Sequence, residues 1–180
     1  MDKTLLRKKL MKVRSEITGR DEKNAIIASR ALDLASRFGS VFIYVSMNSE
    51  VDTHGIIRSL EQNTKVFVPH TDKSGFMRAV MFPPSANLNE TDNYGNIIRS
   101  PDSFFDGQAE LSFVPLLGFD SDCHRIGYGA GCYDRYFAKF AGGLKVGLAF
   151  EEQFCKFEHD LTDMPMDIII TPDRVIRRIK

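Results

Sequence analysis

A glycine-rich segment at residues 124–135, HRIGYGAGCYDR, has the spacing in this chain that is most informative about chemistry. Glycine occurs at alternate positions, Gly127, Gly129 and Gly131, just before a helix-compatible stretch at 136–140. Glycine lets the backbone adopt positive φ and removes the side chain that would keep a ligand away. The amide N–H groups of such a loop can surround an anion, which the positive end of the following helix also attracts. The segment therefore predicts a phosphate site.

The spacing excludes two common nucleotide motifs. No Gly-Lys-Ser/Thr closes the loop as in a Walker A motif, and GxGxG without a strand running directly into it is not the Rossmann pattern. A tight loop before a helix also uses glycine, so the glycines alone leave a purely structural role open. The neighbours favour phosphate, because Arg125 can pair with it in a bidentate way and Asp134 can hold Mg²⁺ through oxygen.

The wider sequence around this loop resembles the signature of the 5-formyltetrahydrofolate cyclo-ligase family, whose members are also called methenyltetrahydrofolate synthetases. The matching segments are 113–116, 118–120, 125–129 and 133–135. Weaker matches occur in the expected order at Lys3–Arg7, Ser46–Thr53, His159–Asp160 and Met166–Pro172, so the resemblance covers nearly the whole chain. Three residues depart from the family pattern. Ala130 and Cys132 replace the usual glycine and aromatic residue, and His124 stands where glycine is common.

The resemblance implies a role for each matching residue. It assigns ATP binding to Lys3, Thr4, Leu5, Leu6, Arg7, Arg125, Ile126, Gly127, Tyr128, Gly129, Ala130, Gly131, Cys132 and Tyr133. It assigns substrate binding to Glu50, Tyr128, Gly129, Ala130, Gly131 and Cys132. Asp134 becomes the preferred Mg²⁺ ligand and Asp167 a second candidate. His159 and Asp160 are interpreted as structural.

Each of these residues also has an ordinary structural interpretation. Lys3 and Arg7 are four apart on one helix face, where most such cations are solvated. An acid in a first helical turn, as expected for Asp134, is stabilised by the helix dipole. Glu50 follows a predicted strand and could be an exposed loop acid, and Asp167 could be an acid at a strand end. A carboxylate at position 50 would nevertheless suit a pterin, whose amino group and ring N–H are donors.

The activity implied by the resemblance is ATP- and Mg²⁺-dependent cyclisation of 5-formyltetrahydrofolate to 5,10-methenyltetrahydrofolate, with release of ADP and phosphate. A phosphorylated formyl intermediate would let the substrate's own N10 attack, so no catalytic serine or cysteine is needed. Two alternatives remain open. One is a paralogue with a different small amide or carboxylate substrate, and the other is a folate- or nucleotide-binding protein without turnover.

Length and composition narrow the class of protein. The chain has 180 residues, 43% hydrophobic and 27% charged, and its formal net charge is zero. We expect one soluble domain over residues 1–180, with small-molecule substrates, no nucleic-acid partner and a monomeric state. Three cysteines without a CxxC pair argue against a disulfide framework or a zinc site and favour a cytoplasmic protein. No apolar run could span a membrane, and no His-rich spacing indicates a transition metal.

Hydrophobic periodicity predicts an α/β fold. Helices are expected at 3–18, with Leu6, Leu10, Val13 and Ile17 on the apolar face, and from Asp21 to about Phe38. A third, capped by Thr53, should run to about Glu61. Strands are expected at 41–45, 65–69, 79–82, 111–115, 144–150, 167–171 and 175–177, with turns at 83–84, 93–96 and 100–102.

Alternating strands and helices predict a single-domain, mostly parallel sheet flanked by helices on both faces. The resemblance implies a NagB/RpiA-like three-layer sandwich. Ligands of such sheets gather at the carboxyl ends of strands, so the segments after Val45, Val114 and Ile170 are candidates for that edge.

Overall fold

The structure, a computed structural model, describes residues 2–82, 86–92, 96, 104–140, 142–160 and 163–179. The helices are α1 (Lys3–Ser15), α2 (Arg20–Ala35), α3 (His54–Leu60), α4 (Cys132–Lys139) and the 3₁₀ turn η1 (Glu151–Gln153). The strands are β1 (Ser40–Ile43), β2 (Lys65–Thr71), β3 (Met77–Met81), β4 (Phe104–Phe105), β5 (Leu111–Val114), β6 (Gly118–Phe119), β7 (Arg125–Ile126), β8 (Leu144–Leu148), β9 (Ile168–Ile170) and β10 (Val175–Arg177).

One sheet of eight strands forms the centre of the molecule, in the order β10-β9-β8-β5-β1-β2-β3-β4. The five strands from β9 to β2 run parallel, while β3, β4 and β10 pair antiparallel at the edges. From β1 the chain first adds β2 on one side and later β5 on the other. The strand order therefore reverses between β1 and β5, which is where open α/β sheets bind ligands.

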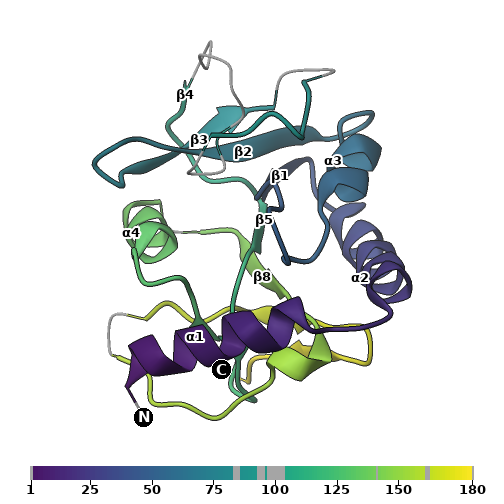
Figure 1. Ribbon diagram of the computed structural model, residues 1–180. Helices are drawn as coiled ribbons and strands as arrows, with labels where there is room; N and C mark the ends of the chain where they lie inside the picture. Colours follow the sequence, from purple (N-terminus) through teal and green to yellow (C-terminus); the bar gives the residue numbers. More distant parts are fainter. Residues whose placement is uncertain are drawn as a thin grey trace.

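Helices cover both faces of this sheet, as predicted (Figure 1). Alternate strand residues point to opposite faces, so Val41 and Ile43 of β1 pack in the cluster that includes Ile27 and Ile56 from α2 and α3. Phe42, between them, points the other way and stacks on Tyr136 of α4, with ring centroids 4.9 Å apart. The period-2 pattern thus builds two cores from one strand.

Helix α1 lies apart from both cores and packs against a small hairpin. The hairpin is β6 paired antiparallel with β7. Leu6 and Leu10 of α1 form a third buried cluster with Leu117 and Ile126, which flank or belong to the hairpin. This packing leaves the face of α1 that carries Lys3, Arg7 and Arg14 directed toward the carboxyl ends of the central strands.

The structure corrects several predicted details. Helix α1 ends at Ser15 rather than at residue 18. Helix α2 begins at Arg20 rather than at Asp21, and its N-cap is Gly19, which has a left-handed φ of 64°. Thr53 precedes α3 as predicted, but its hydroxyl donates to the Tyr44 carbonyl instead of capping the helix. Most of the residues in the predicted turns at 83–84, 93–96 and 100–102 lie outside the described residues. No described helix is long and apolar enough to cross a membrane.

Candidate active site

A cavity of about 980 Å³ opens at the carboxyl ends of β1 and β5. Tyr44 and Val45, directly after β1, and Pro115, directly after β5, form part of its wall. Helix α1, the segment 47–50, the glycine loop and α4 supply much of the rest, together with residues of β2 and β3 and with Asp160 and Asp163. Its position is the point where the strand order reverses, and its volume is at the upper end of the range for ligand sites.

The glycine loop is shaped by close approach and by left-handed backbone. A Cβ at Gly127 would lie 2.7 Å from Nη1 of Arg125, so only glycine leaves room for that guanidinium. Gly131 has a φ of 65° and is the N-cap of α4, which exposes the first amides of the helix to the cavity. The predicted anion-binding arrangement, a glycine loop leading into a helix N-terminus, is therefore present.

Arg125 and Asp134 form an ion pair beneath this loop. Nη2 of Arg125 donates to Oδ1 of Asp134 at 2.8 Å, and the same oxygen accepts the Met164 amide at 3.3 Å. Arg125 is only 8% exposed, and its Nε has no hydrogen-bond partner among the described residues. A buried donor without a partner is costly, so this guanidinium has capacity to bind an incoming anion.

One face of α1 turns its cations to the cavity. Nζ of Lys3 donates to Asp160 at 2.6 Å and to Asp163 at 2.9 Å, which joins the first helix to the C-terminal part of the chain. Burial opposes the charge of Lys3, but these two hydrogen bonds outweigh it and raise the pKa of the ammonium group. Nε of Arg7 donates to the Gly127 carbonyl at 3.0 Å. The helix and the glycine loop are thus held together.

A second polar network occupies another part of the wall. The hydroxyl of Tyr128 donates to Oε1 of Glu50, and it accepts a 2.7 Å hydrogen bond from Nη1 of Arg14. Oε2 of Glu50 accepts the Met47 amide at 2.8 Å. Burial raises the pKa of Glu50, although the hydrogen bonds from Tyr128 and Met47 oppose the shift. This carboxylate is a poorly hydrated acceptor, which suits a ligand that presents N–H donors.

Comparison with known proteins places this site in a family. The model of the 5-formyltetrahydrofolate cyclo-ligase family matches residues 1–172. The 5-formyltetrahydrofolate cyclo-ligase of Mus musculus is 30% identical over 148 residues, which cover 74% of this chain and 73% of the relative. This chain belongs to the 5-formyltetrahydrofolate cyclo-ligase family.

Two solved structures have the same fold. A 5,10-methenyltetrahydrofolate synthetase of Aquifex aeolicus superposes with a TM-score of 0.82 at 23% identity, covering 98% of this chain and 93% of that one. A 5,10-methenyltetrahydrofolate synthetase from Mycoplasma pneumoniae gives 0.76 at 23% identity, covering 96% and 99%. At this identity they establish the fold, and the predicted mostly parallel sheet is confirmed.

The cavity of this cyclo-ligase family member includes most residues that the sequence predicts. Every position from Arg125 to Asp134 lines it, as do Lys3, Arg7 and Glu50. The predicted ATP-binding role needs correction at three positions that do not line the cavity, namely Thr4, Leu5 and Leu6. Successive helical residues point about 100° apart, so Leu6 turns into the third cluster and Leu5 is 60% exposed to solvent.

Asp167 also needs correction, because the structure does not bring it to Asp134. Its Oδ2 accepts the Lys145 amide at 2.9 Å and lies 3.3 Å from Nζ of the same residue. Lys145 is at the start of β8, and Asp167 directly precedes β9, so both lie at the amino ends of the parallel strands. The cavity is at the carboxyl ends, and Asp167 has the structural role that its position at a strand end also allowed.

Several cavity residues had no predicted binding role, among them Arg14, Asp160 and Asp163. Arg14 is 4% exposed and joins the Tyr128 network, and Asp160 and Asp163 hold Lys3. Helical spacing could have found Arg14, because it lies seven residues after Arg7 on the same helix face. Asp160 was interpreted as structural, and Asp163 offered no local sign because its contact with Lys3 spans 160 positions.

Proposed function

We propose that this chain converts 5-formyltetrahydrofolate to 5,10-methenyltetrahydrofolate, with ATP as co-substrate. The observation that carries the proposal is the division of one large cavity between a cationic glycine loop and a desolvated carboxylate. The first part suits a polyphosphate, and the second suits the donor edge of a pterin. Family membership supports the same activity.

The reaction balances without a protein nucleophile. The formyl oxygen on N5 attacks the γ-phosphorus of ATP and ADP leaves, giving an imidate-like phosphate. The N10 amine then attacks the activated formyl carbon and loses its proton. The C–O bond breaks, and inorganic phosphate carries away the former formyl oxygen. Because the substrate supplies both nucleophiles, the protein contributes positioning and charge neutralisation.

We assign the phosphates to the glycine-loop end. Lys3, Arg7 and Arg125 are within the cavity wall, and the α4 N-terminus adds its free amides. The resemblance assigns the loop residues 128–132 to both substrates. All of them line the cavity, and the Tyr128 hydroxyl is hydrogen-bonded to Glu50. Ala130 is larger than the glycine that is usual at its position, and Cys132 is smaller than the usual aromatic residue. These two residues therefore change the space beside the loop, while the hydrogen-bonded groups at either end of the cavity stay the same.

Asp134 fits the predicted Mg²⁺ site, and the fit can be judged from its contacts. Among the described residues, the hydrogen bonds from Arg125 and from the Met164 amide both go to Oδ1 of Asp134, so Oδ2 is available to bind a cation. Mg²⁺ prefers oxygen and is usually held by one or two carboxylates with water and substrate phosphates. Asp160 and Asp163 line the same cavity and offer further oxygens. Bound Mg²⁺ would neutralise charge on the ATP phosphates.

An absorbance assay for methenyltetrahydrofolate with and without ATP tests the proposal directly. We expect product only when both substrates are present, with one ADP released per product. ADP release with another amide or carboxylate, but not with reduced folates, would show the paralogue instead. Ligand-induced thermal stabilisation without any ADP would show a binding protein that lacks turnover.

A further inference from the structure

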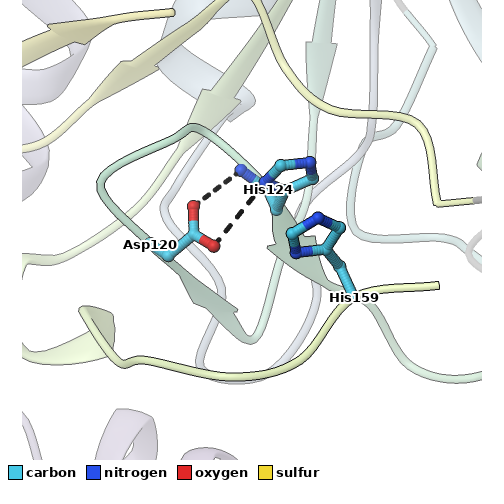
Figure 2. Close-up of side chains that lie close together, drawn as sticks. All are labelled: Asp120, His124 and His159. Carbon is cyan, nitrogen blue, oxygen red and sulfur yellow. Dashed lines mark hydrogen bonds and ion pairs between the residues drawn. The ribbon is translucent and has the colours of Figure 1, made fainter. Parts of the chain in front are cut away.

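Three metal-ligating side chains meet outside the cavity (Figure 2). Asp120, His124 and His159 each bring one possible ligand atom to within 4.8 Å of the others. None of them lines the cavity. Residue spacing did not predict this cluster, because Asp120 and His124 lie in the β6–β7 turn and His159 comes from the segment that follows η1.

The turn holds its two ligands on the same side. The Asp120 amide donates to the His124 carbonyl at 3.2 Å, and Cys123 adopts a φ of 62° that closes the loop. Oδ1 of Asp120 accepts the amides of Asp122 and His124, both at 2.9 Å. The carboxylate is therefore fixed through one oxygen, while Oδ2 faces Nδ1 of His124 at 3.6 Å, beyond hydrogen-bond distance.

The His124 ring has an unused nitrogen in a covered position. Its side chain is 12% exposed, and its Nδ1 is buried with no hydrogen-bond partner among the described residues. His159 is exposed and lies flat against it, with ring centroids 3.6 Å apart and an interplanar angle of 10°. The buried Nδ1 of His124 lies near a carboxylate oxygen and a second imidazole. The two rings are stacked in nearly parallel planes, so the exposed His159 must turn before both imidazoles can direct a nitrogen at one cation.

We propose that Asp120, His124 and His159 bind a divalent transition metal, with Zn²⁺ as the best match to one carboxylate and two imidazoles. Zinc binds such donors at about 2.0–2.2 Å, so tetrahedral ligand atoms lie roughly 3.3 Å apart. The cluster must contract to reach that spacing, and the exposed His159 is the side chain free to move. Three protein ligands leave a fourth position for water.

The site would connect the two segments that carry charged cavity residues. His124 directly precedes Arg125, which pairs with Asp134, and His159 directly precedes Asp160, which pairs with Lys3. A metal bound here would fix those segments against each other without touching the substrates.

Metal binding by tag-free, chelator-stripped protein tests the inference independently of catalysis. Zn²⁺ is titrated in competition with a chromophoric chelator, and the bound metal is counted by elemental analysis. We expect one Zn²⁺ per chain and at least tenfold weaker binding in both His124→Gln and His159→Gln. His70→Gln, which removes an imidazole outside the cluster, should bind as the parent does. His159 is exposed, so its variant is the one least able to disturb folding.

Cobalt provides a second, spectroscopic measurement. Co²⁺ at this site should give visible ligand-field bands without a thiolate charge-transfer band, because no cysteine belongs to the cluster, and His159→Gln should lose those bands. Parent protein that binds no Zn²⁺, or a His159→Gln variant that binds it with unchanged affinity and stoichiometry, would overturn the proposal. A thiolate band would assign the metal to the cysteines instead. None of these outcomes depends on cyclo-ligase activity.

Discussion

The two ends of the cavity hold their charges in different ways. At the glycine-loop end, Lys3 and Arg125 are each paired with carboxylates at 2.6–2.9 Å. At the other end, the Glu50 carboxylate has no ion-pair partner among the described residues and is held by the neutral donors of Tyr128 and Met47, while Arg14 donates to Tyr128. The cations at the glycine-loop end are neutralised by carboxylates, whereas the carboxylate at the other end is stabilised by hydrogen bonds from neutral donors.

This difference predicts that ligand binding at the two ends responds to different changes, to salt at one end and to loss of a single acceptor at the other. A polyphosphate at the loop end must share cations that already have partners, so its binding should weaken as salt screens the charges. A pterin at Glu50 gains hydrogen bonds to a half-buried carboxylate, so its binding should depend on that single acceptor. The four predictions below test this division, from the largest expected effect to the smallest.

Replacing Glu50 with alanine should give the largest effect. Removing an acceptor opposite buried donors costs about 1–3 kcal/mol, which corresponds to a rise of roughly five- to 150-fold in the folate KM. The ATP KM should stay within about twofold, since Glu50 lies at the other end. Steady-state kinetics with each substrate varied in turn measure both values. Glu22→Ala, an exposed acid on α2, is the control. Equal rises in both KM values would remove the proposed division of the cavity.

Asp134→Asn should lower kcat by about tenfold, or 1.4 kcal/mol of transition-state stabilisation, and raise the Mg²⁺ concentration needed for half-maximal rate. The amide is nearly isosteric, so the hydrogen bond from Arg125 can persist while the charge is lost. Circular dichroism should show an unchanged fold. Unaltered turnover and Mg²⁺ dependence would leave Asp134 with only its structural ion pair.

Lys3→Ala combined with Arg7→Ala should weaken ATP binding by about fivefold or more, which corresponds to roughly 1 kcal/mol, with folate binding unchanged. Calorimetric titration of each ligand measures this. The matched control is Lys8→Ala with Lys12→Ala, two exposed cations on the same helix. Normal ATP affinity in the first double variant would return Lys3 and Arg7 to a role in holding α1 to the rest of the chain.

Glu50→Gln should show the smallest effect, a gain in stability of under about 1 kcal/mol at neutral pH. Burial raises the folded-state pKa of Glu50 above its ordinary 4.5, so the unfolded state loses this proton first and ionisation lowers the stability of the folded state. The cost appears as pH rises from 4.5 through the folded pKa, and it is absent below 4.5, where both states are protonated. Urea unfolding at pH 7 and at pH 4 should show the gain only at the higher pH. A gain of the same size at both would assign it to packing.

Local patterns predicted the parts of the fold that depend on neighbours in sequence. The apolar run at 41–45 predicted a central strand, and the glycine spacing at 127–131 predicted a loop that lines the cavity. The four-residue spacing of Lys3 and Arg7 placed them on one helix face, and their predicted role in ATP binding came from the family resemblance. The prediction for Leu6 came from the family motif, which covers a run of consecutive residues. It was wrong because consecutive residues of a helix point in different directions, and Leu6 points into the third buried cluster. That the chain forms a single domain stays a prediction.

Contacts between distant segments could not be predicted in this way. Asp163 reaches Lys3 across 160 positions, and His159 meets His124 only because the segment after η1 lies against the β6–β7 turn. Asp167 was assigned with Asp134 from its motif, although strand direction places it at the opposite edge of the sheet. Pairing of distant residues depends on topology, which no local pattern contains.

The ion pairs of Lys3 also bear on the order in which the molecule forms during synthesis. Asp160 and Asp163 follow Lys3 by 157 and 160 positions, so they are synthesised long after it. Contacts of such long sequence separation close late, because the loop between them must be ordered first. A nascent chain could therefore assemble β1, β2 and their covering helices well before this corner of the cavity exists. On this view the cavity takes its final form late in folding, after most of the central sheet is in place.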